Sequence, residues 1–352
     1  MHTKNPIILD CTLRDGSYVI DFQFNKNHTK KISSALANAK IKYIEIGHGI
    51  GLGASKAGYG KSAITDEEYC VSMSNAKIGE SKWGMFCIPG IASIDDLLMT
   101  IDHGIDFIRI GTDIDKIEES KTFIEIAKKR GLTVFSNFMK SYKVSSKTFS
   151  SSANLSHQYG SDIIYIVDSA GTMTPNKVKE FADNVMQSNE NIKLGFHGHN
   201  NLGLGMGNCI AAIESGVKFV DSTLQGMGRS AGNVATEHLV CVLNNMNLCN
   251  DIDPIQIMDI GEKLIRPLLY NVGYSSLDIT SGWKEFHSSH MKKILEVSKK
   301  NNLDPRRLIS NLFDNKIGIN ETEKIKYLIK NMKSKYPTSI KKWPKYFGEE
   351  ES

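Results

Sequence analysis

The sequence of 352 residues predicts an α/β protein whose main body is a closed (β/α)8 TIM barrel with a small C-terminal helical extension. Short runs rich in β-branched residues alternate with longer stretches of helical periodicity. Eight such pairs span about 245 residues, which is the size expected of this barrel. After about residue 250 the alternation stops, and only helical patterns follow. These observations predict one barrel followed by helices.

The alternation defines each expected element. The strands are expected at 7–10, 42–46, 84–88, 107–110, 133–135, 163–167, 193–196 and 219–222. The helices between them are expected at 27–39, 65–76, 93–103, 115–130, 146–159, 174–188, 203–215 and 231–244. Several helices carry start signals, such as Ser93 at an N-cap and Pro175 at a first helical position.

An open, doubly wound sheet is the rival fold, because periodicity alone does not distinguish a closed sheet from an open one. Its usual mark is a G-x-G-x-x-G turn directly after the first strand. Here the turn at residues 11–16 reads Cys-Thr-Leu-Arg-Asp-Gly and contains no glycine cradle. The barrel is therefore favoured.

The last hundred residues are expected to be helical, at 254–270, at 284–300, from Asp304-Pro305 onward, and at 322–335. We expect a catalytic barrel domain at 1–285 and a helical region with a Lys-rich tail at 286–352. Eight lysines lie between Lys324 and Lys345, with aromatic residues among them. A solvated helix face with a loose terminus is favoured over a surface that binds anions.

Composition excludes several classes of protein. The net charge is only +4, so nucleic acid is not an expected partner. No apolar run approaches the roughly 20 residues that span a bilayer, and the N-terminus lacks the pattern of a signal peptide. The six cysteines include no C-x-x-C pair, which is typical of free thiols in a reducing compartment. We expect a cytoplasmic protein that binds no membrane.

The sharpest functional signal is His197-x-His199 at the end of the seventh expected strand. Alternate residues of a strand project from the same face, so both imidazoles point one way. Two imidazoles and a carboxylate suit a divalent ion with open positions for substrate. Asp15, after the first strand, is the candidate third ligand, and Arg14 beside it suggests an anion partner. Each of these residues also has a purely structural interpretation. The two histidines could be hydrogen-bonded loop residues, and Arg14 could form a structural ion pair. Ser169, after the sixth expected strand, could donate to a substrate carboxylate or cap the turn that follows it.

Several motifs together resemble a known family. The motifs are Thr12-Leu13-Arg14-Asp15-Gly16, His197-x-His199-Asn200, Gly226-x-Gly228-x-x-Ala231-Gly232-Asn233, His48-Gly49-x-Gly51-Leu52, Val167-Asp168-Ser169-x-Gly171 and Arg266-Pro267-Leu268. They resemble the metal-dependent aldolase and lyase superfamily that includes hydroxymethylglutaryl-CoA lyase, and within it the 4-hydroxy-2-oxovalerate aldolase branch. The likeness covers roughly residues 6–330.

The resemblance implies a carbon–carbon lyase that works through a pyruvate-type enolate. It implies a divalent metal on Asp15, His197 and His199, with Asn233 as a further candidate ligand. Mn²⁺ is the first expectation, with Mg²⁺, Co²⁺ and Zn²⁺ as alternatives. Arg14 would act in catalysis and bind a 2-oxo acid, whereas His48 and Ser169 would bind substrate. The second substrate would be an aldehyde.

Two departures from the branch concern proton transfer. The relatives carry a catalytic histidine three residues after the metal aspartate, where this chain has Tyr18. They carry a tyrosine near the end of the barrel, where the nearest match here places Lys284. We expect Tyr18 and Lys284 to be the catalytic residues that replace them, with a role in binding substrate as the alternative for each. We also expect an aldehyde other than acetaldehyde.

Two other functions stay open from the sequence. One is a Claisen-type condensation with acetyl-CoA, as in isopropylmalate synthase, and the other is a catalytically silent binding homologue. The resemblance also implies a homo-oligomer and an aldehyde dehydrogenase partner, although residues 312–330 diverge from the segment of the relatives that would contact it.

Overall fold

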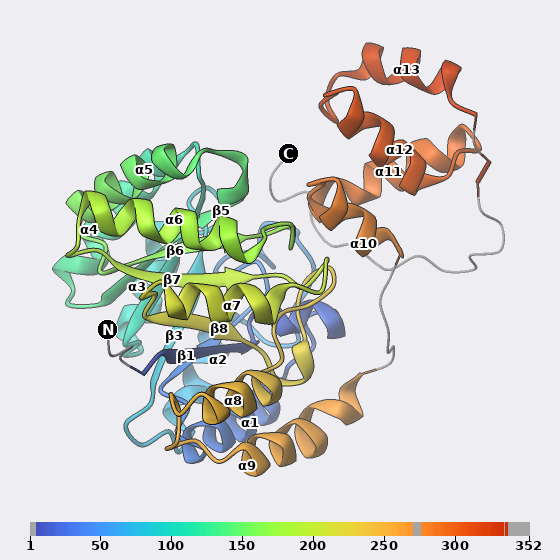
Figure 1. Cartoon of the computed structure of the whole chain (residues 1–352). Coiled ribbons are helices and arrows are strands. Elements are labelled where there is room, and N and C mark those ends of the chain that lie inside the picture. The colour runs from blue at the N-terminus through green and yellow to red at the C-terminus, as the bar shows by residue number, and fades with distance from the viewer. Residues whose placement is uncertain (1–4, 270–275, 334, 337–352) are drawn as a thin grey trace.

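The computed structural model describes residues 5–269, 276–333 and 335–336. Eight parallel strands form a closed barrel in which each strand pairs with its neighbours in sequence and β8 pairs with β1 (Figure 1). The strands are β1 (Ile7–Leu13), β2 (Tyr43–Ile46), β3 (Lys82–Cys87), β4 (Phe107–Asp113), β5 (Thr133–Met139), β6 (Ile163–Asp168), β7 (Lys193–Gly198) and β8 (Phe219–Ser222). The predicted closed barrel is confirmed.

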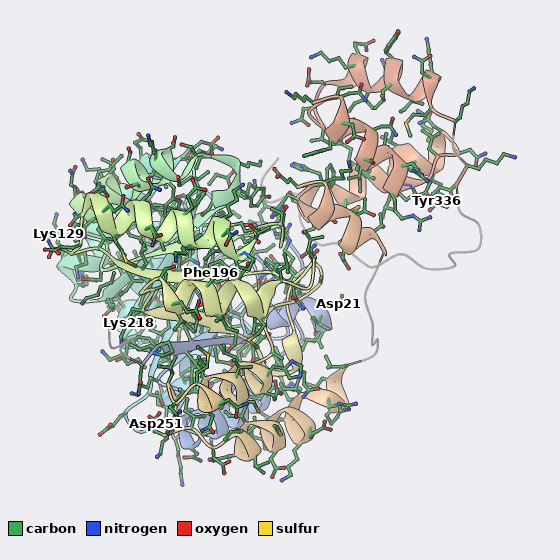
Figure 2. All side chains as sticks on the ribbon, in the orientation of Figure 1. Asp21, Lys129, Phe196, Lys218, Asp251 and Tyr336 are labelled. Atoms are coloured by element: carbon green, nitrogen blue, oxygen red, sulfur yellow. The ribbon has the colours of Figure 1, made fainter. Side chains whose placement is uncertain are left out.

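Helices cover the outside of the barrel. They are α1 (Lys26–Asn38), α2 (Asp66–Ser74), α3 (Ile94–Asp102), α4 (Lys121–Lys129), α5 (Ser146–Tyr159), α6 (Pro175–Ser188), α7 (Gly205–Glu214) and α8 (Thr236–Asn245). Ser93 caps α3, because its side chain accepts a hydrogen bond from the backbone N–H of Asp96. Figure 2 shows Phe196 of β7 within the body of the barrel and Lys129, at the end of α4, at its edge.

Aromatic rings close the barrel near the N-terminal ends of its strands. Tyr43, Phe107, Phe135 and Phe219 pack ring against ring, with centroids 5.1–5.8 Å apart. Phe135 also packs against Tyr165. Because this end is filled with rings, the space left for a ligand lies toward the C-terminal ends of the strands.

The strand period of two places a charged layer directly above the aromatic one. Glu45 lies two residues after Tyr43, Arg109 two after Phe107, and Asp221 two after Phe219. The three charged residues are fully or almost fully buried. The sequence therefore positions a buried polar layer between the aromatic layer and the open end of the barrel.

The structure corrects the expected start of the eighth barrel helix. The helix expected at 231–244 begins at Thr236, and the preceding segment is a loop. Gly232 in this loop has a φ of +80°, and Asn233 pairs with His199 in an isolated β-bridge. This backbone conformation is incompatible with an earlier helix start.

The helical patterns after the barrel are also only partly right. The helix expected at 254–270 is α9 (Pro254–Ile260), followed by the single π-turn η5 (Gly261–Ile265) and the 3-10 turn η6 (Arg266–Leu268). Pro267 breaks the helical hydrogen bonding, and residue 270 lies outside the described residues. The other elements are α10 (Ser276–Trp283), the 3-10 turn η7 (Ser288–His290), α11 (Met291–Lys300), α12 (Pro305–Asp314) and α13 (Thr322–Asn331).

The helix expected at 284–300 was wrong in its first four residues, since helical structure begins only with the 3-10 turn at Ser288. Helix α10 ends at Trp283, and the backbone N–H groups of Lys284 and Phe286 bond to the carbonyls of Thr280 and Ser281. Glu285 takes a left-handed φ of +50°, so the chain turns before α11. In the tail, Trp343 and Tyr346 lie outside the described residues.

Helices α10 to α13 gather as a group at one end of the barrel (Figure 1). They share an apolar core that includes Leu277 of α10, Met291 of α11, Leu308 of α12 and Ile325 of α13. The domain boundary at residue 285 stays a prediction. Within the described part of the chain, no helix is long and apolar enough to cross a membrane.

Replacing Phe135 with alanine tests the aromatic layer. The side chain is fully buried among four other rings, so we expect the variant to lose about 3–5 kcal/mol of unfolding free energy. Urea denaturation followed by circular dichroism measures this loss. Tyr327→Ala is the control, because Tyr327 is 73% exposed and should change stability by less than about 0.5 kcal/mol. Similar values for the two variants would contradict the role of the layer.

Candidate metal centre and active site

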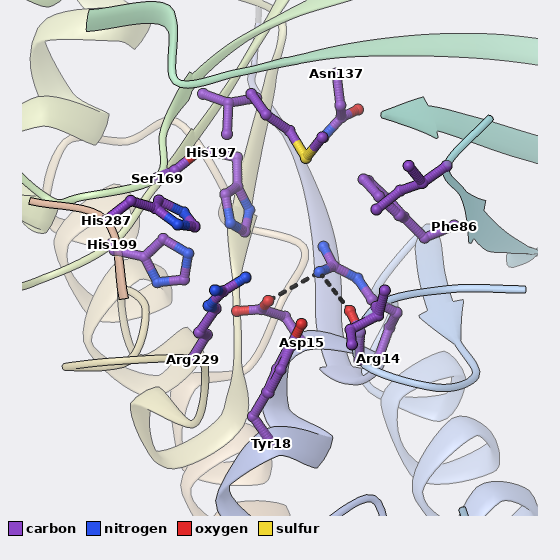
Figure 3. Close-up of a pocket in the computed structure, with 15 residues that line it drawn as sticks. Arg14, Asp15, Tyr18, Phe86, Asn137, Ser169, His197, His199, Arg229 and His287 are labelled. Atoms are coloured by element: carbon purple, nitrogen blue, oxygen red, sulfur yellow. Dashed lines mark hydrogen bonds and ion pairs between the residues drawn. The ribbon is translucent and has the colours of Figure 1, made fainter. Parts of the chain in front are cut away.

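A cavity opens at the C-terminal ends of the barrel strands, where catalytic groups of this fold lie. The lining residues come from the ends of several strands, from the loops that follow them, and from the segment between α10 and η7. They are Arg14, Asp15, Tyr18, Gly49, Ile50, Phe86, Ile88, Asn137, Met139, Val167, Ser169, His197, His199, Arg229 and His287. Figure 3 shows the charged and imidazole side chains facing one another across this space.

Asp15, His197 and His199 come together in this cavity. One ligand atom from each lies within 4.8 Å of the others, and all three side chains are buried. His197 belongs to β7, and His199 is the first residue after the end of that strand. Because side chains two residues apart in a strand project from the same face, both rings point to the same side. Asp15 lies just after the end of β1, as the first residue of the 3-10 turn η1 (Asp15–Ile20).

The protonation states favour a cation at this point. Burial lowers the pKa of His199 to about 4, which keeps its ring neutral at pH 7. Burial alone would raise the pKa of Asp15, but the nearby Arg14 guanidinium and the two histidines hold that pKa below its usual value. A neutral imidazole and an ionised carboxylate are the forms that bind metal ions.

Two buried atoms support the same conclusion. Nδ1 of His199 and Oδ1 of Asn233 have no hydrogen-bond partner among the described residues. Asn233 is held against the group, since its Nδ2 donates a hydrogen bond of 2.5 Å to Oδ2 of Asp15. Buried polar atoms without partners are rare and call for an explanation such as an ion. The donor set of Asp15, His197 and His199 therefore fits a divalent metal.

A second group, Cys11 with His197 and Asp221, also has ligand atoms within 4.8 Å. It fits a metal less well. Burial raises the pKa of the Cys11 thiol well above its usual value, so the thiol keeps its proton. Asp221 already accepts a hydrogen bond of 2.8 Å from Nδ1 of His197.

Arg14 is fixed beside Asp15. Its Nη1 donates to Oδ1 of Asp15 at 2.8 Å, and its Nε donates to Oε2 of Glu45 at 2.9 Å. Its guanidinium carbon lies 4.7 Å from the centroid of the Phe86 ring. Figure 3 shows this side chain on the cavity wall next to Asp15. A positive charge is therefore held in a defined position at the metal centre.

A buried ion-pair network joins Arg14 to His197. Arg109 donates from Nη1 to Oε2 of Glu45 at 3.0 Å and from Nη2 to Oδ2 of Asp221 at 2.6 Å. The same Asp221 oxygen accepts from His197, so the Nδ1–H of that ring points down into the network. The lone pair on Nε2 of His197 is then left for the metal, as is usual for metal-binding histidines.

The structure brings two further predicted residues into the cavity. Tyr18 lies on its wall, with the Arg229 guanidinium carbon 5.6 Å from the centroid of the Tyr18 ring. Ser169 also lines the cavity, and its hydroxyl accepts a hydrogen bond of 3.0 Å from the backbone N–H of Lys140. The Ser169 hydroxyl keeps a proton that it can donate to a ligand.

Two predicted residues are not brought to the cavity. His48 packs beneath the loop after β2, where its ring stacks on Phe22 with centroids 3.9 Å apart and bonds to the carbonyl of Gly60. Lys284 lies in the C-terminal helical group, with its Nζ 2.7 Å from Oδ1 of Asp314. Neither residue is among those that line the cavity.

Sequence reasoning missed several residues of the site. His287 and Arg229 both line the cavity. His287 lies only three residues after Lys284, and Arg229 lies within the glycine-rich motif at 226–233. Both residues therefore lie close in sequence to a residue or motif that the sequence analysis named. Arg109 and Asp221 were detectable as charges two residues beyond aromatic strand residues.

Comparisons with known proteins identify the family to which the chain belongs. The profile of the HMGL-like family matches residues 5–264. The chain is 36% identical over 308 residues to the 4-hydroxy-2-oxovalerate aldolase of Geobacillus genomosp. 3, covering 87% of this chain and 90% of that one. It is 33% identical over 310 residues to the enzyme of the same name from Thermus thermophilus, covering 88% and 89% of the two chains.

Solved structures share the fold. Hydroxymethylglutaryl-CoA lyase from Pseudomonas aeruginosa superposes with a TM-score of 0.66 at 17% identity, covering 78% of this chain and 96% of that one. The carboxyl transferase domain of Rhizobium etli pyruvate carboxylase gives 0.73 at 15% identity, covering 94% of this chain and 60% of that one. Identities this low establish a common fold only.

Removing a ligand tests the metal centre. We expect Asp15→Asn and His199→Ala each to weaken Mn²⁺ binding by at least about 100-fold, more than the loss of an outer partner costs. Isothermal titration calorimetry measures the affinity. His103→Gln is the control, since His103 pairs with Glu67 on the surface of the barrel and should leave the affinity unchanged. Unchanged Mn²⁺ affinity in His199→Ala would refute the assignment.

Asp221→Asn tests the network beneath the metal. The variant removes the charge that pairs with Arg109 and orients His197. We expect Mn²⁺ affinity to fall about 10–100-fold and unfolding free energy to fall by about 3 kcal/mol. Asp162→Asn removes a carboxylate that pairs with Lys128 instead, and its Mn²⁺ affinity should equal that of the wild type. Equal affinities for both variants would show that the network does not orient the ligand.

Proposed function

Because the chain belongs to the HMGL-like family, we propose that it is a divalent-metal-dependent aldolase acting on 4-hydroxy-2-oxo acids. The observation that carries the proposal is the buried set of Asp15, His197 and His199 directly beside Arg14. The reaction would divide the substrate into a pyruvate-type 2-oxo acid and an aldehyde. A silent binding homologue would not need this combination of an ion site and a fixed cation.

Asp15, His197 and His199 would hold the metal, with the Asn233 amide oxygen as a further candidate. Two imidazoles and a carboxylate can bind several divalent ions, and the resemblance to the aldolase branch makes Mn²⁺ our first choice among them. When bound, the ion would supply positive charge to the oxygen of an enolate. Arg14 would stabilise the same developing charge with its guanidinium, which Asp15 and Glu45 hold in place before substrate arrives.

The substrate carboxylate would bind between cationic and hydroxyl groups on the cavity wall. Ser169 can donate a hydrogen bond from its hydroxyl, and Arg14 and Arg229 add positive charge from other sides. Both arginines belong to the set that faces the histidines in Figure 3. A 2-oxo acid matches this arrangement, because its negative charge and its oxo group are on adjacent carbons.

The aldehyde half would contact the apolar part of the wall. Ile50, Phe86, Ile88, Met139 and Val167 line the cavity. An apolar wall gives methylene groups a favourable environment. We therefore propose an aldehyde larger than acetaldehyde as the second product.

Release of pyruvate tests this function. We expect Mn²⁺-loaded protein to cleave racemic 4-hydroxy-2-oxovalerate, and to cleave 4-hydroxy-2-oxohexanoate faster, with the pyruvate detected through lactate dehydrogenase. EDTA should abolish both reactions. Arg14→Met should lower kcat by about 100-fold or more, the usual cost of one electrostatic contact to the transition state.

Arg306→Met is the matched control for Arg14→Met. Arg306 forms an ion pair with Asp304 at the start of α12, away from the cavity, so its loss should not change kcat. Cleavage by the EDTA-treated protein at the same rate would contradict a metal-dependent aldolase. So would an absence of pyruvate release from both substrates.

A further inference from the structure

We propose that His287 is the catalytic residue that takes the proton from the 4-hydroxyl group when the substrate is cleaved and returns it in the reverse reaction. This inference rests on the proposed aldolase function. It assigns the proton transfer to a side chain from the C-terminal segment, beyond the barrel itself. The structural support is a docked segment, a buried ring at the cavity, and the chemistry of the other cavity residues.

The segment that carries His287 is tied to the loops at the open end of the barrel. Nε of Arg229 donates a hydrogen bond of 2.8 Å to the Ser288 hydroxyl. Nearby, Ser230 donates from its hydroxyl to Oδ1 of Asp278 at 3.0 Å, and Asn201 donates from Nδ2 to the Asp278 carbonyl at 3.0 Å. These bonds join the loops after β7 and β8 to both sides of the turn that contains His287.

This docking places the His287 ring inside the site. The residue is only 4% exposed and lines the same cavity as the two metal-site histidines. In Figure 3 its ring enters from the side of Ser169 and His199, opposite Arg14. The ring of His287 therefore faces the substrate space from the side opposite the Arg14 guanidinium.

The hydrogen bonds at Nδ1 of His287 determine which neutral form of the ring can take a proton at Nε2. Nδ1 of His287 lies 2.9 Å from the Ser289 hydroxyl and 3.3 Å from the Ser289 backbone nitrogen. A backbone N–H only donates, so it favours the neutral ring with its proton on Nε2. Removal of the hydroxyl proton at Nε2 requires the other neutral form, in which the Ser289 hydroxyl accepts from Nδ1–H, as a hydroxyl can either donate or accept.

The other cavity residues are less suited to this role. Histidine is the side chain whose ordinary pKa is close to neutrality, and two of the three cavity histidines belong to the metal set. The guanidinium groups of Arg14 and Arg229 keep their protons. Tyr18 is a phenol, which ordinarily holds its proton at pH 7, and Lys284 pairs with Asp314 outside the cavity.

The step balances without an added reagent. The imidazole of His287 takes the proton of the 4-hydroxyl, and the electrons of that O–H bond form the aldehyde C=O. The C3–C4 bond breaks, and its electron pair forms the enolate, with C2=C3 as the double bond. The imidazolium returns its proton to C3, which gives pyruvate and neutral histidine. In the reverse direction the imidazolium protonates the alkoxide formed from the aldehyde.

Two reactions that form the same enolate test the role of His287 independently of the roles of the other site residues. Cleavage of racemic 4-hydroxy-2-oxovalerate requires removal of a hydroxyl proton. Decarboxylation of oxaloacetate breaks its C3–C4 bond with loss of CO₂, and no hydroxyl proton has to leave. We expect His287→Gln to lower cleavage by about 100-fold or more, as loss of a general base does, while decarboxylation stays within threefold of the wild type.

Binding and folding readouts accompany the two assays. The Mn²⁺ affinity of His287→Gln, measured by calorimetry, should stay within threefold of the wild type, and its thermal unfolding should remain cooperative. His290→Gln is the matched control, because His290 lies in the same turn and is absent from the cavity lining. It should retain both reactions.

The outcomes distinguish this inference from the proposed function. Wild-type protein that neither cleaves nor decarboxylates would refute the aldolase function itself. Active wild type with a His287→Gln variant that keeps cleavage within fivefold would overturn only the role of His287. Equal losses of cleavage and decarboxylation would also overturn it, because they indicate a structural effect. A selective loss of cleavage in Tyr18→Phe, with none in His287→Gln, would transfer the role to Tyr18.

Discussion

The site depends on satisfying the charges buried beneath it. Arg109 is completely inaccessible to solvent, as is Glu45, and Asp221 is almost so. An unpaired charge in such a place would cost several kcal/mol, so each must keep its partner. The pairing fixes these three side chains, and they in turn hold Arg14 through Glu45 and His197 through Asp221. The substrate-facing cation and a metal ligand thus share one rigid support.

The two halves of the proposed reaction come from different parts of the chain. Strand ends β1 and β7 provide Asp15, His197 and His199, with Arg14 alongside. The segment after α10 provides His287, and it reaches the barrel through hydrogen bonds that include the one between Arg229 and Ser288. Among the described residues, the hydrogen bonds that join Arg14, Glu45, Arg109, Asp221 and His197 involve no residue of the C-terminal segment. Such a division lets the acceptor half of a site change while the enolate half stays intact.

Local patterns predicted what depends on local geometry. Alternating strand and helix patterns gave the closed barrel, and the i, i+2 spacing of His197 and His199 predicted that both rings face one way. The position of Lys284 could not be predicted from local patterns. The left-handed turn at Glu285 stops the expected helix and directs Lys284 toward Asp314. His287, three residues later, reaches the cavity through contacts with loops more than fifty residues earlier in the chain, which no periodicity reports.

Every role proposed for this site serves the formation of a pyruvate enolate with the help of a metal. Exchange of the pyruvate methyl hydrogens in D2O, followed by mass spectrometry, tests it without any aldehyde. We expect deuterium uptake with Mn²⁺-loaded protein, none after EDTA treatment, and recovery when Mn²⁺ is restored. Asp15→Asn should show no uptake above the protein-free rate. Uptake that is insensitive to EDTA, or no uptake with Mn²⁺, Mg²⁺, Co²⁺ and Zn²⁺ alike, would refute metal-dependent formation of the enolate.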